Sequence, residues 1–143
     1  MAAAGLALTV AGTGMMAGTA QADGAFTRYA NMNSDKCLDG NAAGDVYAST
    51  CQSFNPWMTW AQQYDRGWWV HGATGRCLDS DRYGKVYTSP CQTGNQHQQW
   101  QHMGSSVYMN RATGLCLANS LGSSVVYAKG CDIRDPNQRW EDQ

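Results

Sequence analysis

The chain has 143 residues, which is room for one domain or two very small ones. Ten lysines and arginines against eleven aspartates and glutamates give a formal net charge of −1, which argues against a phosphate-binding surface and so against nucleic acid as a partner. Only 15% of the residues are charged and six are tryptophan, which excludes a disordered chain, because such chains are charge-rich and aromatic-poor.

Residues 1–22 carry no charged side chain and end in Ala20-Gln21-Ala22. An apolar stretch that ends in Ala-x-Ala predicts a signal peptide cleaved after Ala22, although the usual basic start is missing. The alternative is a transmembrane anchor, for which the stretch is long enough but is diluted by glycine and threonine. We expect a secreted, extracellular domain over residues 23–143, with its six cysteines paired in an oxidising compartment.

A repeat of about 40 residues fills residues 23–143, with boundaries near 25–62, 63–102 and 103–143. Each copy has a first cysteine, a second cysteine and a tryptophan nine residues later. These positions are Cys37, Cys77 and Cys116; Cys51, Cys91 and Cys131; and Trp60, Trp100 and Trp140. The repetition predicts one disulfide within each copy, closing a loop of about 15 residues. The alternative, zinc on free thiols, is disfavoured because Cys-x-x-Cys and paired histidines are missing.

Each repeat is expected to consist of strands and turns, since helical periodicity is missing. Strands are predicted at five runs that combine valine with tyrosine or tryptophan, namely 45–48, 67–71, 85–88, 107–110 and 125–128. Turns are predicted at Asp39-Gly40-Asn41 and Gln92-Thr93-Gly94-Asn95. Four strands in each repeat give about twelve. One repeat cannot bury a hydrophobic face alone, so we expect three to close around a common axis, with the repeated tryptophans in the core rather than exposed as binding platforms.

The repeated pattern Cys-Leu-Asp, Gly-x-Val-Tyr, Cys and Gln-x-Trp resembles the ricin-type β-trefoil lectins. Gln98-Gln99-Trp100 and Gln138-Arg139-Trp140 carry the family's Gln-x-Trp signature, and Met58-Thr59-Trp60 departs from it. Residues 74–91 are similar to the actinohivin-type lectins of actinomycetes within that family, where an aromatic residue stands four positions before the second cysteine. The resemblance implies an all-β β-trefoil with a pseudo-threefold axis, and binding of high-mannose glycans through α1,2-linked mannose.

A sugar site needs an aromatic ring for the C–H face of the sugar and fixed polar groups for its hydroxyls. Strand alternation puts Leu38 and Val46 in the core, and Asp39 and Tyr47 on the opposite face. Together with the resemblance, this predicts carbohydrate-binding residues in every repeat: Asp39, Tyr47, Gln52 and Trp57; Asp79, Tyr87, Gln92 and His97; and Tyr127, Asp132 and Asn137. Because Ala118 replaces the aspartate in the third repeat, we expect two competent sites and one weak or dead site. The alternative is that the aspartate only braces a turn and the tyrosine only favours a strand.

Catalytic and metal-binding patterns are missing from the sequence. The only glutamate is Glu141, and Asp79 and Asp81 are both expected in the turn after Cys77, which does not provide two carboxyls across a cleft. His97 and His102 do not fall on one strand face, so we expect surface histidines and no metal or other cofactor. The sequence predicts a non-enzymatic glycan-binding lectin without membrane insertion. The alternatives are a module for galactosides or xylan, and a sugar-blind trefoil that binds a protein such as a protease through loops such as 53–57.

Overall fold

The computed structural model describes residues 24–143, so the signal peptide predicted at 1–22 lies outside the described residues. Residues 24–143 form short β-strands joined by turns and three single 3-10 turns. The strands are β1 (Tyr29–Asn31), β2 (Lys36–Gly40), β3 (Val46–Thr50), β4 (Trp60–Gln63), β5 (Trp68–His71), β6 (Cys77–Ser80), β7 (Val86–Ser89), β8 (Trp100–His102), β9 (Tyr108–Asn110), β10 (Leu115–Asn119), β11 (Val126–Gly130) and β12 (Trp140–Asp142). The 3-10 turns are η1 (Pro56–Met58), η2 (Gln96–Gln98) and η3 (Pro136–Gln138). Within this range no helix has the length and apolarity that crossing a bilayer requires.

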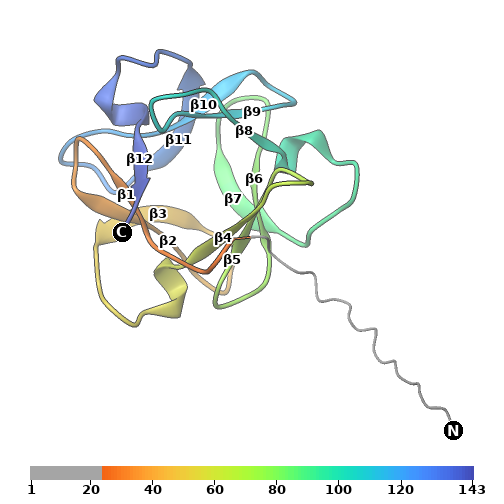
Figure 1. Ribbon diagram of the computed structural model, residues 1–143, viewed down its shortest axis with the longest axis horizontal. Helices are drawn as coiled ribbons and strands as arrows, with labels where there is room; N and C mark the ends of the chain where they lie inside the picture. The colour runs from red at the N-terminus through yellow and green to blue at the C-terminus, as the bar shows by residue number, and fades with distance from the viewer. Residues whose placement is uncertain (1–23) are drawn as a thin grey trace, which may run out of the picture.

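The strands form three antiparallel four-stranded sheets with the orders β12-β1-β2-β3, β4-β5-β6-β7 and β11-β10-β9-β8. Figure 1 shows the three sheets as lobes around a central axis. The sheets do not coincide with the sequence repeats. Strand β4 ends the first repeat but pairs with β5 of the second, and β12 ends the third repeat but pairs with β1 of the first. Each repeat is therefore completed by its neighbour, which is why one copy cannot fold by itself.

Six strands form a barrel, and three hairpins cap it. The barrel strands form three hydrogen-bonded pairs, β1 with β12, β4 with β5 and β8 with β9. The ring is closed by backbone hydrogen bonds between these pairs, from the N–H groups of Trp60, Trp100 and Trp140 to the carbonyls of Thr27, Gly67 and Ser106. The caps are the hairpins β2–β3, β6–β7 and β10–β11. Their β3, β7 and β11 strands meet on the axis through isolated bridges such as Asp45 to Tyr87 and Lys85 to Tyr127. The expected all-β trefoil is confirmed.

The three repeated tryptophans lie in the core, as predicted. Trp60, Trp100 and Trp140 are buried, and each indole Nε1 donates a hydrogen bond of 3.0 to 3.1 Å to a backbone carbonyl. The acceptors are the equivalent leucines Leu38, Leu78 and Leu117. Each tryptophan thus provides a large apolar surface and satisfies its polar atom inside its own repeat. One leucine and one valine from each repeat complete a single cluster around them, together with Tyr29, Ala48, Trp69, Tyr108 and Ala128.

The three disulfides pair as predicted, one in each repeat: Cys37–Cys51, Cys77–Cys91 and Cys116–Cys131. Their sequence separations are 14, 14 and 15 residues. Each bond ties the strand that carries the Cys-Leu-Asp pattern to the end of the strand that carries the tyrosine, except that Ala118 replaces the aspartate in the third repeat. The disulfides therefore hold together the two strands on which the candidate sugar-binding residues stand.

The turn predicted at Asp39-Gly40-Asn41 was placed too early. Asp39 and Gly40 belong to β2, and the turn begins at Asn41, whose N–H donates to Asp45. The same error applies to Asp79, which lies in β6 rather than in the turn after Cys77. The reason is that cross-strand hydrogen bonding extends the strand through residues whose own preferences favour turns.

The 3-10 turns were not predicted from the sequence. Each begins after a capping residue whose side chain accepts a hydrogen bond from the N–H two residues later: Asn55, Asn95 and Asp135. Proline suits the first position of η1 and η3, because a backbone N–H at this position would have no partner within the turn and proline has no N–H. One turn is too short to give the 3.6-residue periodicity by which helices are recognised.

Candidate carbohydrate-binding site

The aspartate and tyrosine of the first two repeats face each other across a hairpin. Asp39 of β2 is the direct partner of Tyr47 in β3, and Asp79 of β6 is the partner of Tyr87 in β7. Directly opposed residues of an antiparallel pair project on the same face, with Cβ atoms about 5 Å apart. Burial, and then the nearby aspartate, raise the pKa of both tyrosine hydroxyls. The structure thus brings together the two residue types that the sequence selected.

The two carboxylates are more enclosed than strand alternation indicated. Asp39 is 7% exposed and Asp79 is 5% exposed. Ser49 Oγ donates to Asp39 Oδ2 at 2.5 Å, and Ser89 Oγ donates to Asp79 Oδ2. Each Oδ1 accepts the next backbone N–H at 2.8 Å. A carboxylate has about four acceptor positions, so the serine and the backbone fix its orientation and leave acceptor capacity for a ligand.

The glutamine of the Gln-x-Trp signature braces the second site. Gln98 Nε2 lies 3.2 Å from Asp79 Oδ2, 2.7 Å from Ser89 Oγ and 2.9 Å from the Pro90 carbonyl. Its Oε1 accepts the backbone N–H of Gln92 at 2.8 Å. Gln98 therefore ties the carboxylate, its serine partner and the loop after the second cysteine to one another.

The first repeat lacks this brace because methionine replaces the signature glutamine. Met58 Sδ lies 3.3 Å from the backbone N–H of Gln52, a weak substitute for an amide oxygen. No bond to Asp39 equivalent to that of Gln98 is formed among the described residues. Asp39 consequently keeps more acceptor capacity than Asp79, although its surroundings are less firmly held.

The loop residues of the two sites are arranged in parallel. Gln52 and Gln92 are exposed, and each Oε1 accepts a side-chain N–H from Asn55 or Asn95, at 2.8 and 2.9 Å. The side-chain Nε2 of each glutamine therefore has the donor role toward a ligand. The loops continue directly into η1 and η2, which carry the remaining candidate of each site.

The remaining candidates, Trp57 and His97, differ in their surroundings. Trp57 on η1 is 38% exposed, with its ring 5.9 Å from the His71 ring. His97 on η2 is half-buried, and its Nδ1 lies 2.7 Å from the Ser80 carbonyl. A carbonyl only accepts, so Nδ1 carries the proton in the neutral ring and Nε2 is an acceptor. The first site thus offers an indole face and the second a polar ring edge.

The third repeat has rearranged its polar groups. Ala118 stands opposite Tyr127, whose hydroxyl bonds to Ser120 Oγ at 2.8 Å. Lys129 occupies the position of Ser49 and Ser89, and its Nζ bonds to Asp135 Oδ2 at 2.9 Å. Burial alone would raise the pKa of Asp135, but the hydrogen bonds from Lys129 and from a backbone N–H lower it.

The other two candidates of the third repeat are also bonded within the protein. Asn137 Oδ1 accepts from Asn33 at 2.6 Å, and Asp132 Oδ1 accepts from the backbone N–H of Arg134 at 2.9 Å. Tyr127, Asp132 and Asn137 thus all bond to other groups of the protein, and the residue opposite the tyrosine, Ala118, has no carboxylate.

A side chain six residues before the first cysteine joins each repeat to the preceding one around the axis. Asn31, His71 and Asn110 are all buried. Each bonds to the backbone carbonyl of a 3-10 turn residue, namely Asn137, Trp57 and His97, at 2.7 to 2.8 Å. Because the Trp57 carbonyl only accepts, His71 Nε2 carries the proton in the neutral ring, and Nδ1 accepts from Thr74 Oγ1 at 2.8 Å. Burial lowers the His71 pKa, against the smaller raising effects of the Trp57 carbonyl and Asp39.

Sequence reasoning missed the roles of Ser49, Ser89 and Gln98. A signal for them was present: the residue two before the second cysteine is serine where the aspartate is kept and lysine where it is replaced by Ala118. Among residues 24–143, no group of three or more histidines, cysteines, aspartates and glutamates is arranged to hold a metal ion.

The family model of the ricin-type beta-trefoil lectin domain matches residues 25–140. The chain belongs to the ricin-type β-trefoil lectin family. This confirms the resemblance seen in the repeated motif, and the fold is that of carbohydrate-binding lectins. Comparison with curated protein sequences finds no match.

Several solved structures, lectins among them, are similar to this chain. The hemolytic lectin CEL-III is 25% identical, with a TM-score of 0.71 over 81% of this chain, which spans 29% of CEL-III. The C-half of an earthworm R-type lectin, solved with GalNAc, is 14% identical, with a TM-score of 0.69 over 82% of this chain and 97% of its own. GalNAc-T7, solved with UDP, GalNAc and Mn2+, is 18% identical, with a TM-score of 0.70 over 82% of this chain, which spans 22% of GalNAc-T7.

Proposed function

We propose that this ricin-type lectin is a non-enzymatic protein that binds neutral glycans through two shallow sites, in the first and second repeats. The observation that carries the proposal is the cross-strand pairing of Asp39 with Tyr47 and of Asp79 with Tyr87. In each pair the ring would contact the C–H face of a sugar, and the carboxylate would accept bonds from neighbouring hydroxyls. Single shallow sites bind weakly, so useful affinity comes from two sites on one branched or polymeric glycan.

Two sugar classes are supported as ligands, and we propose α-mannose first. The tyrosine four positions before the second cysteine resembles the arrangement in actinohivin-type lectins, which implies high-mannose glycans. Galactosides come second: the earthworm neighbour was solved with GalNAc, and a homologue of type II RIPs from bitter gourd, 15% identical with a TM-score of 0.71 over 83% of this chain and 48% of its own, with α-methyl-D-galactoside.

A glycan array with mannans, galactosides and xylan tests the function. The double variant Asp39→Asn with Asp79→Asn keeps the shape of both side chains and removes both charges. Loss of a hydrogen bond to a charged group weakens each site by about 1–3 kcal/mol, or roughly five- to 150-fold. Asp35→Asn is the matched control, because Asp35 is an exposed carboxylate at a positive φ that asparagine also adopts. Binding that survives in the double variant would contradict the site assignment.

We also propose that the protein is exported by the sequence at residues 1–22. Support comes from the Ala20-Gln21-Ala22 end of that uncharged stretch and from the pairing of all six cysteines, which is typical of secreted domains. Sequencing the N-terminus of protein from the culture medium should give Asp23. A product that retains residues 1–22 would contradict this proposal.

The loop at residues 53–57 supports protein binding as a second candidate function. Phe54 is fully exposed at φ 59°, where the second repeat has Gly94. A phenylalanine held in this conformation costs stability without contributing to the core, as expected of a contact residue. If the array finds no ligand, and if Phe54→Gly abolishes binding to a protein partner identified by pull-down, the loop is the functional site.

A further inference from the structure

A hollow of about 910 Å³ lies at the barrel end formed by β1, β4, β5, β8, β9 and β12, apart from the Asp–Tyr pairs. Its base is an aromatic cluster with one ring from each repeat: Trp69 lies 4.5 Å from Tyr29 and 4.7 Å from Tyr108, between ring centroids. Gln62 Nε2 bonds to both tyrosine hydroxyls, at 3.1 and 3.4 Å. The hollow thus has a fixed, closed base and a volume within the range of small-molecule sites.

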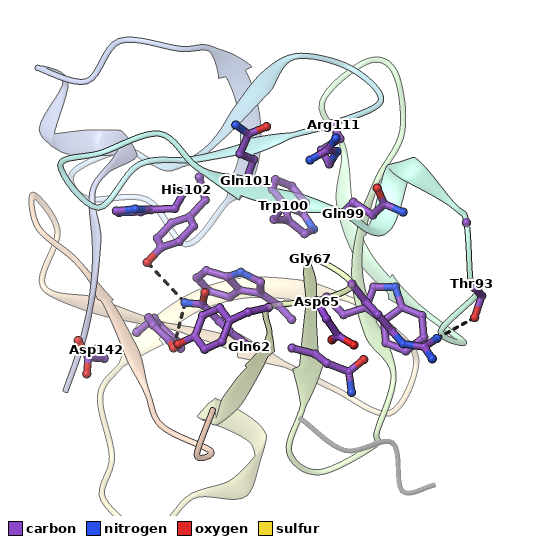
Figure 2. Close-up of a pocket in the computed structure, with 18 residues that line it drawn as sticks. Gln62, Asp65, Gly67, Thr93, Gln99, Trp100, Gln101, His102, Arg111 and Asp142 are labelled. Carbon is purple, nitrogen blue, oxygen red and sulfur yellow. Dashed lines mark hydrogen bonds between the residues drawn. The ribbon is translucent and has the colours of Figure 1, made fainter. Parts of the chain in front are cut away.

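One side of the hollow contains a tryptophan that the other two repeats do not have. Trp68 occupies the repeat position of Arg28 and Val107, so the fold does not need an indole there. Trp68, Arg66 and Thr93 line this side of the hollow together with Arg111. Figure 2 shows Thr93, Gln99 and Arg111 on one side of the hollow, and His102 and Asp142 on the other.

Trp68 carries a buried donor without an acceptor. Its side chain is 7% exposed, and its Nε1 has no hydrogen-bond partner among the described residues. Trp60, Trp100 and Trp140 differ, because each donates to a carbonyl. An unpaired indole N–H in the lining of a hollow is satisfied when a ligand supplies an oxygen.

One arginine lies over the Trp68 ring, and a second lines the same hollow. Arg66 lies over the Trp68 ring, with Cζ 4.9 Å from the centroid, and its Nη1 donates to Thr93 Oγ1 at 2.8 Å. This leaves further guanidinium N–H groups for a ligand. Arg111 is exposed, and its backbone is fixed by a 2.9 Å bond to the Gln99 carbonyl. The lining of the hollow carries two arginines, Arg66 and Arg111, and two aspartates, Asp65 and Asp142, and Figure 2 shows Asp142 on the opposite side from Thr93.

We propose that this side of the hollow is an additional site for a carboxylate-bearing sugar, a uronic acid residue of an acidic glycan. Arg66 binds the carboxylate beside Trp68, Arg111 binds a second carboxylate of the same acidic glycan, and the Trp68 N–H donates to a ring or hydroxyl oxygen. Guanidinium groups suit carboxylates because they offer several N–H donors in one plane. The site uses neither Asp39 nor Asp79, so it does not depend on the proposed neutral-glycan function.

The probe is trigalacturonate, with its fully methyl-esterified form as the neutral control. Titration of the 15N-labelled chain should shift the indole N–H signal of Trp68, assigned with Trp68→Phe, and leave the signals of Trp60, Trp100 and Trp140 nearly unchanged. We expect Arg111→Gln to weaken binding at least fivefold and Trp68→Phe at least threefold. The esterified probe should bind at least fivefold more weakly.

Each of the other outcomes overturns the proposal. An unshifted Trp68 signal places any binding elsewhere, and equal binding of the ester removes the role of the arginines. Binding that is lost in the Asp39→Asn, Asp79→Asn double variant assigns the acidic sugar to the Asp–Tyr sites. Arg111 is exposed, so Arg111→Gln gives a result even if Trp68→Phe does not fold, and thermal unfolding verifies the fold of each variant.

Discussion

The second and third repeats share a framework and differ in their site. Both have a disulfide between equivalent strands and a buried tryptophan bonded to a leucine carbonyl. In the second repeat Asp79 is held by Ser89 and Gln98, whereas the third has an alanine there and a lysine that pairs with an aspartate. The fold therefore tolerates loss of the carboxylate when its partners change with it, so the aspartate is not required for folding.

Removal of a disulfide should have the largest effect and should not distinguish the two repeats. Cys77→Ser with Cys91→Ser, and Cys116→Ser with Cys131→Ser, should each lower the free energy of unfolding by about 3 kcal/mol, because loops of 14 and 15 residues gain similar entropy when they open. Urea denaturation measures both losses. A loss confined to one repeat would show that the shared framework is not equally important in the two.

Removal of the second-repeat carboxylate should have the next largest effect. Asp79→Ala leaves Ser89 Oγ and the Ser80 N–H without their acceptor and removes one of the three bonds of Gln98 Nε2, and should lower the free energy of unfolding by about 1–3 kcal/mol. Adding Ser89→Lys and Asn95→Asp copies the arrangement of the third repeat.

The triple variant separates stability from binding. It should recover at least half of the lost stability, mainly because Ser89, which loses its acceptor, is replaced, since a partly exposed ion pair adds only about 0–1 kcal/mol. It should not recover glycan binding at the second repeat. Thermal unfolding and a glycan titration measure the two properties, and restored binding would contradict the role given to Asp79.

The reverse exchange should build a site in the third repeat. Ala118→Asp with Lys129→Ser supplies the carboxylate opposite Tyr127 and the serine that orients it. The number of glycan sites per chain, measured by titration with a short oligosaccharide, should increase by one. Ala118→Asn with Lys129→Ser is the control, since it has a similar shape without the charge. If the count does not change, the Asp–Tyr pair alone is insufficient for binding.

The smallest effect concerns pH and the contact between repeats. Burial keeps the pKa of His71 in the folded protein below the usual 6.5. As the pH falls through about 6.5, the unfolded chain gains a proton that the folded chain does not, so the free energy of unfolding decreases until the pH reaches the folded pKa. His71→Asn copies Asn31 and Asn110 and should remove this decrease. Thermal unfolding of both proteins between pH 7.5 and pH 5 measures the difference, and identical slopes would contradict it.

Much of the framework could be predicted because the same short-range rules act three times. The cysteine spacing predicted the disulfides, and the 40-residue spacing of Trp60, Trp100 and Trp140 predicted the core. Period-two alternation placed Asp39 and Tyr47 on one face, which their pairing across the hairpin bears out. The turn at Asp39 was misplaced because pairing with β3 outweighed the local preference of aspartate and glycine for turns.

What the sequence determined by itself was the unit: strand order, disulfide, core tryptophan, and the pair of residues opposite each other on a hairpin. Tertiary structure decided what surrounds that unit. The enclosure of Asp79 depends on Gln98, 19 residues away, and the contact of His71 depends on Trp57 in the preceding repeat. The hollow beside Trp68 likewise needs Arg111 from the third repeat. Local periodicity acts on neighbouring residues, whereas burial and charge depend on which distant segments the closed barrel brings together.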